Sequence, residues 1–332
     1  MTLRAGLVGL GMMGRHHARV LRQLEGVELV ALADPGGDPH GVADGLPLLG
    51  SAQEVTAAGI DVAVVAVPTA LHEDVALAFA EAGVHVMVEK PLAPTAESAR
   101  RIVEAFESRG LVGCVGHIER FNPALQQLRA RLEHGDLGEV YQIATRRQGP
   151  FPSRIADVGV IKDLATHDID LTAWVTQRDY VTVSAQVAHR SGREHEDLVA
   201  AVGLLEGGTV ASHLVNWLSP FKERVTVVTG ERGAFVADTL TADLTYHANA
   251  SVPSEWESLA SFRGVSEGDV LRFAFPKREP LLAEHEAFRD SVLGKETHAV
   301  AMRQGLRTVE VAEEMLASTE VAGTGSYGAT VA

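Results

Sequence analysis

The sequence contains a single cysteine, Cys114, among its 332 residues, so no intrachain disulfide can form. A chain with so few thiols suits a reducing compartment such as the cytoplasm, where disulfides are rare. Cys114 lies in the apolar run at residues 111–115. Because cysteine in such a run usually packs as a small hydrophobe, we expect a buried thiol that takes no part in chemistry.

The sequence also lacks a long basic run and an apolar run of membrane-spanning length. It has 29 basic and 44 acidic residues, and its formal net charge is −15, which disfavours binding to nucleic acid or to an anionic membrane. No charged-then-apolar leader opens the chain. We therefore expect a soluble, cytoplasmic protein with no nucleic-acid or membrane partner. Its length and its 46% hydrophobic content predict about two globular domains.

The most informative segment is GLVGLGMMG at residues 6–14, in which Gly9, Gly11 and Gly14 form a G-x-G-x-x-G pattern. An apolar strand pattern precedes it, a helix pattern at 15–24 follows it, and a second apolar run at 27–33 ends in Asp34. Strand, glycine turn, helix and terminal acid together predict a dinucleotide-binding unit. The alternative is a plain glycine turn in another α/β protein.

Each part of this unit has an expected task. Gly9 permits the tight turn, Gly11 lets the backbone approach a pyrophosphate, and Gly14 lets the helix pack on the sheet. The pyrophosphate would lie at the amino end of the helix, beside Met12 and Met13. Asp34 would accept hydrogen bonds from the adenosine ribose, and its charge would repel a 2′-phosphate. The cofactor predicted is therefore NAD, with NADP less favoured.

The first third of the chain alternates strand and helix patterns. Short apolar strands separated by amphipathic helices are typical of a doubly wound parallel sheet, the Rossmann architecture. Residues 35–51 are interpreted as a loop. The expected strands are at 5–10, 29–33, 62–67, 85–88 and 111–115, and the expected helices are at 15–24, 74–82 and 96–108.

The rest of the chain changes pattern after a helix at 122–132. Closely spaced strands, with hairpin turns at 207–208 and 231–233, indicate an α+β domain with an antiparallel sheet. We predict an NAD-binding domain at 1–121 and a substrate-binding domain at 122–332, with the closing segment 281–318 packing partly on the first. The tail from residue 322 is expected to be loose. The expected strands are at 140–147, 181–189, 198–205, 209–216, 224–229, 234–238 and 244–246, and the helices at 161–175, 280–293 and 302–318.

Several polar side chains follow the strands of the first domain, where open α/β sheets bind ligands. Lys90, in the sequence Glu89-Lys90-Pro91, could hydrogen-bond both the cofactor and a substrate hydroxyl, or could be a solvated surface lysine. Pro68, Thr69 and His72 follow the strand at 62–67 and would line the same crevice, unless Thr69 is only a helix cap. Arg120 and Asn122 follow the strand at 111–115, where Asn122 could instead begin a helix before Pro123.

Asp163 and His167 are four residues apart on the expected helix at 161–175, a spacing that puts both on one helix face. Histidine suits general acid–base chemistry near neutral pH, and a carboxylate can orient it. The alternative is a structural histidine with an aspartate near a helix start. Asp168 and Asp170 project from other faces than His167, so no metal site is expected.

At this point the sequence resembles a known family. The order GLGMMG, VPTALHED, EKPLAPT, GHIERFNPA and KDLATHDID is similar to the glucose–fructose oxidoreductase/inositol dehydrogenase family, Gfo/Idh/MocA, over nearly the whole chain. The resemblance implies a Rossmann domain, then a domain with an open, mostly antiparallel sheet, and NAD(P)-dependent redox chemistry at a sugar or cyclitol carbon. It implies that Lys90 is a catalytic lysine near the nicotinamide and that His167, paired with Asp163, accepts or donates a proton.

The predicted catalytic residues are therefore Lys90, Asp163 and His167, with no metal. The predicted cofactor contacts are Gly9, Gly11, Met12, Met13, Gly14, Asp34, Pro68, Thr69, His72, Glu89, Lys90, Arg120 and Asn122.

The segments HIERFNPA, DVGVIKDLATHDID and NWLSPFKERVTVVTGERGAFVAD resemble the subgroup that acts on UDP-N-acetylglucosamine at C3. One departure is that many family members carry a glycine-rich stretch where this chain has residues 157–163. In that interpretation Trp217, Lys222 and Arg224 lie near the sugar nucleotide or a subunit contact; otherwise they form an ordinary sheet edge.

Three functions stay open: a nucleotide-sugar 3-dehydrogenase, a dehydrogenase or ketoreductase for a free sugar, deoxysugar nucleotide or inositol, and a non-catalytic NAD-sensing regulator. An open sheet with one uncovered face predicts a homodimer or homotetramer.

Overall fold

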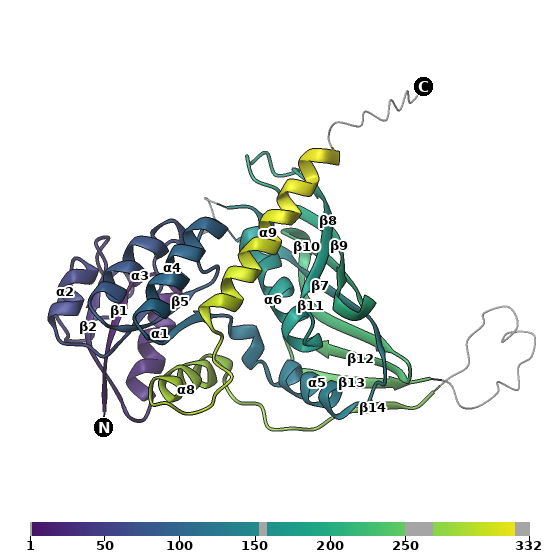
Figure 1. Ribbon diagram of the computed structural model, residues 1–332, viewed down its shortest axis with the longest axis horizontal. Coiled ribbons are helices and arrows are strands. Elements are labelled where there is room, and N and C mark those ends of the chain that lie inside the picture. Colours follow the sequence, from purple (N-terminus) through teal and green to yellow (C-terminus); the bar gives the residue numbers. More distant parts are fainter. Residues whose placement is uncertain (1, 153–157, 250–267, 323–332) are drawn as a thin grey trace, which may run out of the picture. The chain divides into compact units, whose positions relative to one another are not determined.

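The computed structural model describes residues 2–152, 158–249 and 268–322 (Figure 1). The chain divides into two compact units. The first comprises Met1–Phe121 and Arg278–Glu313, and the second comprises Asn122–Lys277 and Glu314–Ala332. The chain therefore builds most of the first unit, then the second, and returns to the first near its end. The tail was predicted from residue 322; residue 322 ends a described helix, and the rest of the predicted tail, from residue 323, lies outside the described residues.

The first unit is built on a six-stranded sheet in the order β3-β2-β1-β4-β5-β6, and every described strand pair in it is parallel. The strand order reverses between β1 and β4, and ligands of doubly wound sheets bind at such a switch point. The predicted Rossmann architecture is confirmed. The strands are β1 (Leu3–Val8), β2 (Val27–Ala33), β3 (Leu48–Leu49), β4 (Val62–Val65), β5 (His85–Glu89) and β6 (Gly113–Gly116).

Helices cover both faces of this sheet, because its strand residues alternate between two cores. Val86 and Val88 of β5 pack with Phe79 and Phe106, whereas Met87 packs on the other face with Leu21 and Phe288 of the first and eighth helices. The helices are α1 (Met12–Gln23), α2 (Ala52–Ala57), α3 (His72–Glu81), α4 (Ala96–Ser108), α8 (Pro280–Val292) and α9 (Met302–Ala322), with short 3₁₀ turns η1 (Thr69–Leu71) and η2 (Ile118–Phe121).

The prediction of a loop at 35–51 is wrong at the end of this range, because the segment contains β3 and leads directly into α2. The Ser51 hydroxyl caps α2 by accepting the Glu54 backbone N–H at 3.2 Å, and it donates in turn to the Glu54 carboxylate at 3.3 Å. This arrangement resembles a capping box. It stabilises a helix that is too short to show an apolar period.

The second unit is built on an eight-stranded sheet in the order β14-β13-β12-β11-β7-β10-β9-β8. All of its described strand pairs are antiparallel except β7 with β10, so the predicted mostly antiparallel sheet is confirmed. β14 was not predicted. The strands are β7 (Val140–Pro150), β8 (Tyr180–Ala188), β9 (Leu198–Leu205), β10 (Val210–Asn216), β11 (Leu218–Gly230), β12 (Gly233–Asp238), β13 (Asp243–Ala248) and β14 (Val270–Arg272).

Helices α5 (Pro123–His134) and α6 (Thr166–Thr176) pack on this sheet (Figure 1). Strand β9 alternates strictly between buried and exposed positions. Its outward residues Val202 and Leu204, with Tyr141 and Val210 of neighbouring strands, are exposed apolar side chains. The sheet therefore presents apolar positions that the described helices do not cover.

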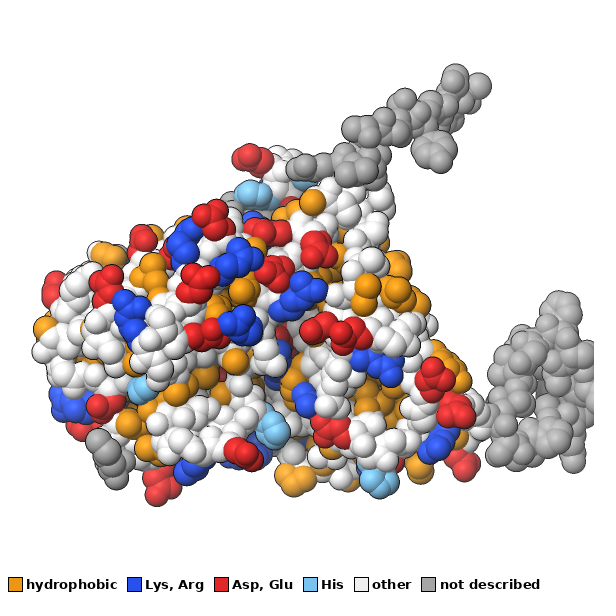
Figure 2. Space-filling model, viewed as in Figure 1, with side chains coloured by type: hydrophobic (Ala, Val, Ile, Leu, Met, Phe, Trp, Pro, Cys, Tyr) orange, Lys and Arg blue, Asp and Glu red, His pale blue; other side chains and the backbone are white. Residues whose placement is uncertain are grey.

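Charged side chains of both signs are interspersed on the face of the molecule shown in Figure 2. Within the first unit they form ion pairs, such as Arg100 with Glu310 and Arg101 with Glu73. None of the helices in the described ranges is long and apolar enough to cross a membrane.

Candidate active site

Three glycines shape the loop between β1 and α1. Gly9 has a φ of +96°, and a Cβ at this position would lie 2.5 Å from the Ala66 backbone. A Cβ on Gly14 would lie 1.9 Å from the Gly9 carbonyl oxygen, so only glycine lets α1 approach so closely. A Cβ on Gly11 would meet nothing within 4 Å. The space above Gly11 is therefore open, as a loop that receives a pyrophosphate requires.

The amino end of α1 and the carboxylate of Asp34 complete this loop. The helix begins after Gly11 without a side-chain cap, so its first-turn N–H groups and its dipole favour an anion. Asp34 accepts the Leu10 N–H through Oδ2 at 2.7 Å and the Gly36 N–H through Oδ1 at 2.7 Å. Each oxygen retains a lone pair for a ribose hydroxyl. The residues present thus fit a dinucleotide.

His72 lies in the interior beside the loop that follows β4. Its side chain is buried, and its Nδ1 is 2.9 Å from the Pro91 carbonyl oxygen while its Nε2 is 3.0 Å from that of Val67. Burial lowers the pKa of this imidazole. His72 therefore links the loop after β4 to the turn after β5. Neither η1 nor α3 begins with a side-chain cap, so Thr69 does not have the capping role that the sequence left open.

Lys90 directly follows β5 and is half-buried. Its backbone N–H donates to Oε2 of Glu89 at 3.1 Å, and Oε1 of Glu89 lies 2.8 Å from Nε2 of His17. Burial raises the pKa of the Glu89 carboxyl, but the His17 hydrogen bond and the charge of Lys90 outweigh burial and leave the pKa below its usual value. An ionised Glu89 therefore lies directly behind the candidate catalytic lysine.

Arg120 and Asn122 have interior partners. The Arg120 Nη1 donates to the Gln304 side chain at 3.1 Å. Asn122 begins the second unit, where its Oδ1 accepts the Ala124 N–H at 3.0 Å and its Nδ2 donates to the Thr239 carbonyl at 3.0 Å. Asn122 thus caps α5, which is the alternative that the sequence left open. A cofactor contact of either residue stays a prediction.

In the second unit, Asp163 and His167 do not share one regular helix. Residues Ile161–Ala165 form a π-helical turn that contains Asp163, and His167 lies in the first turn of α6. The predicted continuous α-helix at 161–175 is therefore wrong in its first turn. Asp163 is buried and His167 is half-buried. The wider turn is of a kind often found at functional sites.

Glu196 holds the start of the π turn, and sequence reasoning missed it. Its carboxylate accepts the Ile161 N–H at 3.0 Å, and its backbone carbonyl accepts the Val160 N–H at 3.0 Å. A Cβ on Gly159 would lie 2.0 Å from the same carboxylate, so this glycine is required by the contact. The acidic pair Glu196-Asp197 directly before β9 was a weak signal, because charged residues also suit an ordinary loop.

The two other acids of the segment have structural positions. Asp168 is buried and accepts the Arg147 Nε through both carboxylate oxygens, at 3.1 and 3.2 Å. Asp170 is also buried. Throughout the described part of the chain, no group of three or more His, Cys, Asp or Glu side chains could hold a metal ion.

The three residues suggested for the sugar nucleotide or a subunit contact differ in environment. Trp217 is buried, with its ring edge-on to Phe151 at 5.3 Å and beneath the Arg193 guanidinium at 5.1 Å. Arg224 donates to the Gln148 carbonyl at 2.7 Å, and Lys222 is exposed on β11. Trp217 therefore packs in the interior between Phe151 and Arg193.

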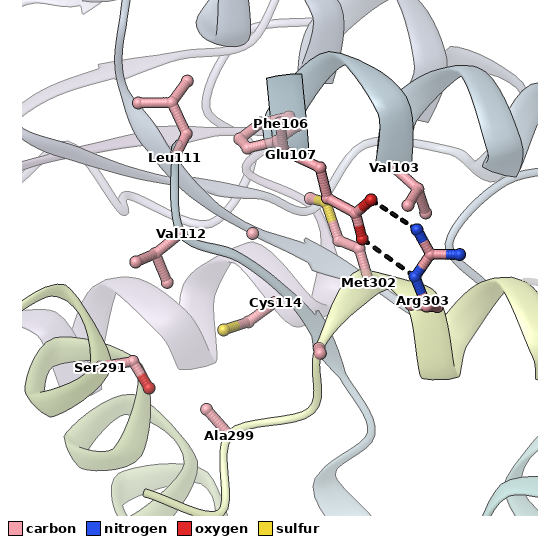
Figure 3. A pocket seen from close by; sticks show the side chains of 12 residues that line it. Val103, Phe106, Glu107, Leu111, Val112, Cys114, Ser291, Ala299, Met302 and Arg303 are labelled. Atoms are coloured by element: carbon pink, nitrogen blue, oxygen red, sulfur yellow. Dashed lines mark hydrogen bonds and ion pairs between the residues drawn. The ribbon is translucent and has the colours of Figure 1, made fainter. Parts of the chain in front are cut away.

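A cavity of about 270 Å³ lies at the amino end of β6 (Figure 3). Apolar side chains and the ion pair of Glu107 with Arg303 line it. The glycine loop follows the carboxyl end of β1, whereas this cavity lies at the amino ends of the parallel strands. It is therefore not the predicted cofactor site. Cys114 lines this cavity and is 4% exposed, and burial raises the pKa of its thiol to about 12. The predicted burial of this cysteine is confirmed.

Comparison with known families decides the affiliation. Residues 3–117 match the profile of an oxidoreductase family with an NAD-binding Rossmann fold, and residues 125–236 match the Gfo/Idh/MocA C-terminal domain. The chain belongs to the Gfo/Idh/MocA family. Its first unit is accordingly the NAD-binding Rossmann domain of this family, as the glycine loop and Asp34 indicated.

Individual relatives in the Gfo/Idh/MocA family carry different names. The chain is 32% identical over 226 residues to a UDP-N-acetylglucosamine 3-dehydrogenase of Acidithiobacillus ferrooxidans, covering 63% of this chain and 66% of the relative. It is 40% identical over 207 residues to an inositol 2-dehydrogenase of Cereibacter sphaeroides, covering 59% and 60%. The matched segments thus span about 60% of the length of such curated relatives.

A solved structure extends the likeness to the whole chain. The structure of the UDP-N-acetylglucosamine 3-dehydrogenase from Acidithiobacillus ferrooxidans has a TM-score of 0.84 at 25% identity, covering 98% of this chain and 100% of that one.

Proposed function

We propose that this protein is an NAD-dependent oxidoreductase that interconverts a secondary hydroxyl and a ketone on a sugar. The preferred substrate is a nucleotide sugar such as UDP-N-acetylglucosamine, at C3. The observation that carries the proposal is the carboxyl end of the sheet in the first unit, where the open space above Gly11, the uncapped start of α1 and Asp34 suit NAD and Lys90 follows β5. The whole-chain likeness to the 3-dehydrogenase supports the substrate.

The nicotinamide ring of bound NAD supplies the hydride acceptor or donor. In the direction of oxidation, the His167 imidazole takes the proton of the substrate hydroxyl, and the Asp163 carboxylate stabilises the imidazolium that forms. The Lys90 ammonium donates a hydrogen bond to the same oxygen and stabilises its developing negative charge. In reduction, His167 returns the proton to the ketone oxygen. The proposal therefore requires Lys90 and His167 to reach one substrate hydroxyl.

An inositol is the second candidate substrate, because the inositol 2-dehydrogenase named above is the more identical of the two relatives over its matched segment. The experiment is a panel of UDP-sugars, free sugars and inositols, with NADH absorbance as the readout. We expect turnover of UDP-N-acetylglucosamine. Turnover of inositols alone would overturn the nucleotide sugar, and tight NAD binding without any turnover would instead support a regulator.

The catalytic roles are tested by Lys90→Met and His167→Asn. We expect each to lower kcat by about 10²- to 10⁴-fold, the usual contribution of a local acid–base or charged group. The affinity for NADH, measured by its fluorescence, should be unchanged. Lys295→Met is the matched control, because Lys295 is an exposed lysine paired with Asp290. Wild-type turnover in both variants would contradict the assignment.

The same proposal includes a cytoplasmic homodimer or homotetramer. A second copy would cover the exposed apolar positions at Val202 and Leu204 on β9. Light scattering of the purified protein, with Val202→Glu as the disrupting variant, tests this assembly. A monomeric wild type would contradict it.

A further inference from the structure

Three ionisable side chains of the first unit, the buried His17 and His285 and the half-buried Glu89, form a chain behind Lys90. His17 comes from α1, Glu89 ends β5, and His285 lies in α8. The His17 Nε2 is 2.8 Å from Oε1 of Glu89, and its Nδ1 is 2.8 Å from Nε2 of His285. The two imidazoles meet edge to face, with ring centroids 5.1 Å apart. Both are at most 1% exposed.

The chain ends on the backbone of the candidate catalytic lysine. Oε1 of Glu89 faces His17, and Oε2 accepts the backbone N–H of Lys90 at 3.1 Å. Gly116 of β6 closes the other side, since a Cβ there would lie 3.3 Å from the Glu89 carboxylate. Each carboxylate oxygen of Glu89 thus has an interior partner.

The proton positions follow from the donors available. The ionised Glu89 can only accept, so His17 carries its proton on Nε2. Burial holds the pKa of His285 well below its usual value, so His285 is neutral. Its Nε2–H then donates to Nδ1 of His17. The Nδ1 of His285 has no partner in the described residues. Because Nδ1 carries no proton in this arrangement, every side-chain N–H of His17 and His285 is hydrogen-bonded.

We propose that Glu89 is a positioning residue for Lys90, and that His17 and His285 hold its carboxylate in place. This inference rests on the proposed catalytic role of Lys90. The Lys90-Pro91 turn is fixed on both sides, because Glu89 binds the N–H of Lys90 and His72 lies 2.9 Å from the carbonyl of Pro91. The lysine side chain therefore leaves a fixed backbone, and a shift of about 1 Å in a reacting group can cost about 10²-fold in rate.

A positioning role and a purely structural role of these three side chains predict different effects on kcat. Two buried imidazoles and a half-buried carboxylate are costly to desolvate, and apolar residues would fill the same space at lower cost. These three are linked in series, and the last of them, Glu89, accepts the N–H of residue 90, where the candidate catalytic side chain begins. Their loss should therefore lower kcat in the folded enzyme, whereas loss of a structural network should lower only stability.

The experiment compares Glu89→Ala, Glu89→Gln and His17→Leu with the wild type. We expect Glu89→Ala and His17→Leu to lower kcat by about 10- to 100-fold, with the KM for the sugar and the affinity for NADH within twofold of wild type. Glu89→Gln should retain more activity than Glu89→Ala. Its amide oxygen still accepts the Lys90 N–H when His17 moves its proton to Nδ1. If Glu89→Ala does not fold, Glu89→Gln and His17→Leu carry the test.

His85→Leu is the matched control. His85 begins the same strand, β5, and its Nδ1 accepts the Val112 N–H at 2.9 Å, far along the strand from Lys90. This variant should lose some stability and keep the wild-type kcat. Wild-type kcat in folded His17→Leu would overturn the proposal. A loss of NADH affinity equal to the loss of kcat would also overturn it, and would assign Glu89 to cofactor binding.

A second readout needs no substrate. The lysines Lys90, Lys162, Lys222, Lys277 and Lys295 are methylated with ¹³C-formaldehyde, and the Lys90 resonance is assigned by its loss in Lys90→Met. We expect this resonance alone to move in His17→Leu and Glu89→Ala, and to stay in place in His85→Leu. If the wild type oxidises no sugar, the proposed function fails while this measurement still decides the positioning role. An unmoved Lys90 resonance would overturn the role.

Discussion

Arg147 and Asp168 form a buried ion pair, in which the guanidinium Nε lies 3.1 and 3.2 Å from the two carboxylate oxygens. Arg147 belongs to β7, and Asp168 directly follows His167 in α6. The two side chains are 4% and 3% exposed. The pair therefore joins α6 to the sheet one residue away from His167, the candidate base.

Arg147→Met leaves the Asp168 carboxylate buried without its cation. Breaking a buried pair in this way costs about 3–5 kcal/mol, so we expect a fall of that size in the free energy of unfolding, measured with denaturant. The double variant Arg147→Met/Asp168→Leu should recover much of it. Arg146→Met is the control, because Arg146 is exposed on the same strand and pairs with Glu223. It should cost less than about 1 kcal/mol. Equal stability of Arg147→Met and wild type would contradict the pair's role.

Gly11 and Gly14 should respond to alanine in opposite ways. Gly14→Ala places a methyl 1.9 Å from the Gly9 carbonyl, so the protein without cofactor should be destabilised by a few kcal/mol. Gly11→Ala meets no protein atom within 4 Å, so its melting temperature without NAD should stay close to wild type. Its methyl occupies the proposed pyrophosphate approach, and its dissociation constant for NADH should rise by about tenfold or more. Unchanged NADH affinity in Gly11→Ala would place the cofactor elsewhere.

The Rossmann half was predictable because its signals are local. Short apolar strands, the glycine pattern and Asp34 at a strand end predicted the doubly wound parallel sheet, and Lys90 was a candidate because of its place after the strand at 85–88. The π turn was not predictable in this way. It begins where Glu196, far along the sequence, accepts the Ile161 N–H, and no periodicity within residues 161–175 encodes that contact. β14 is only three residues long and gives no alternating pattern.

The partners of the candidate site were hidden for a similar reason. His17 looks like any residue of the first helix, and His285 is 268 positions away from it. Their meaning depends on both reaching Glu89 in three dimensions. A motif such as Glu89-Lys90-Pro91 marks where chemistry is expected, but the buried groups that hold it are fixed by tertiary packing.

His213 should make the stability of the protein depend on pH. Its Nδ1 is 2.8 Å from the Thr145 hydroxyl and its Nε2 is 2.7 Å from that of Tyr180, and burial lowers its pKa from 6.5 to about 4. Between these values the unfolded chain binds a proton that the folded chain does not. The stability from this group is therefore complete above about pH 6.5 and falls toward pH 4, by roughly 3 kcal/mol.

Denaturant unfolding of wild type and His213→Gln between pH 4.5 and pH 8 measures this contribution. The variant should be less stable at pH 8, because it loses the hydrogen bonds of His213 with Thr145 and Tyr180. Its stability should fall less steeply as the solution is acidified. Other buried histidines with lowered pKa, such as His72 and His285, slope in the same direction, so the difference between the two curves isolates His213. The exposed His247→Gln should keep the wild-type slope. Parallel curves for His213→Gln and wild type would mean that the proton is bound elsewhere, and that the imidazole between Thr145 and Tyr180 does not titrate as its burial requires.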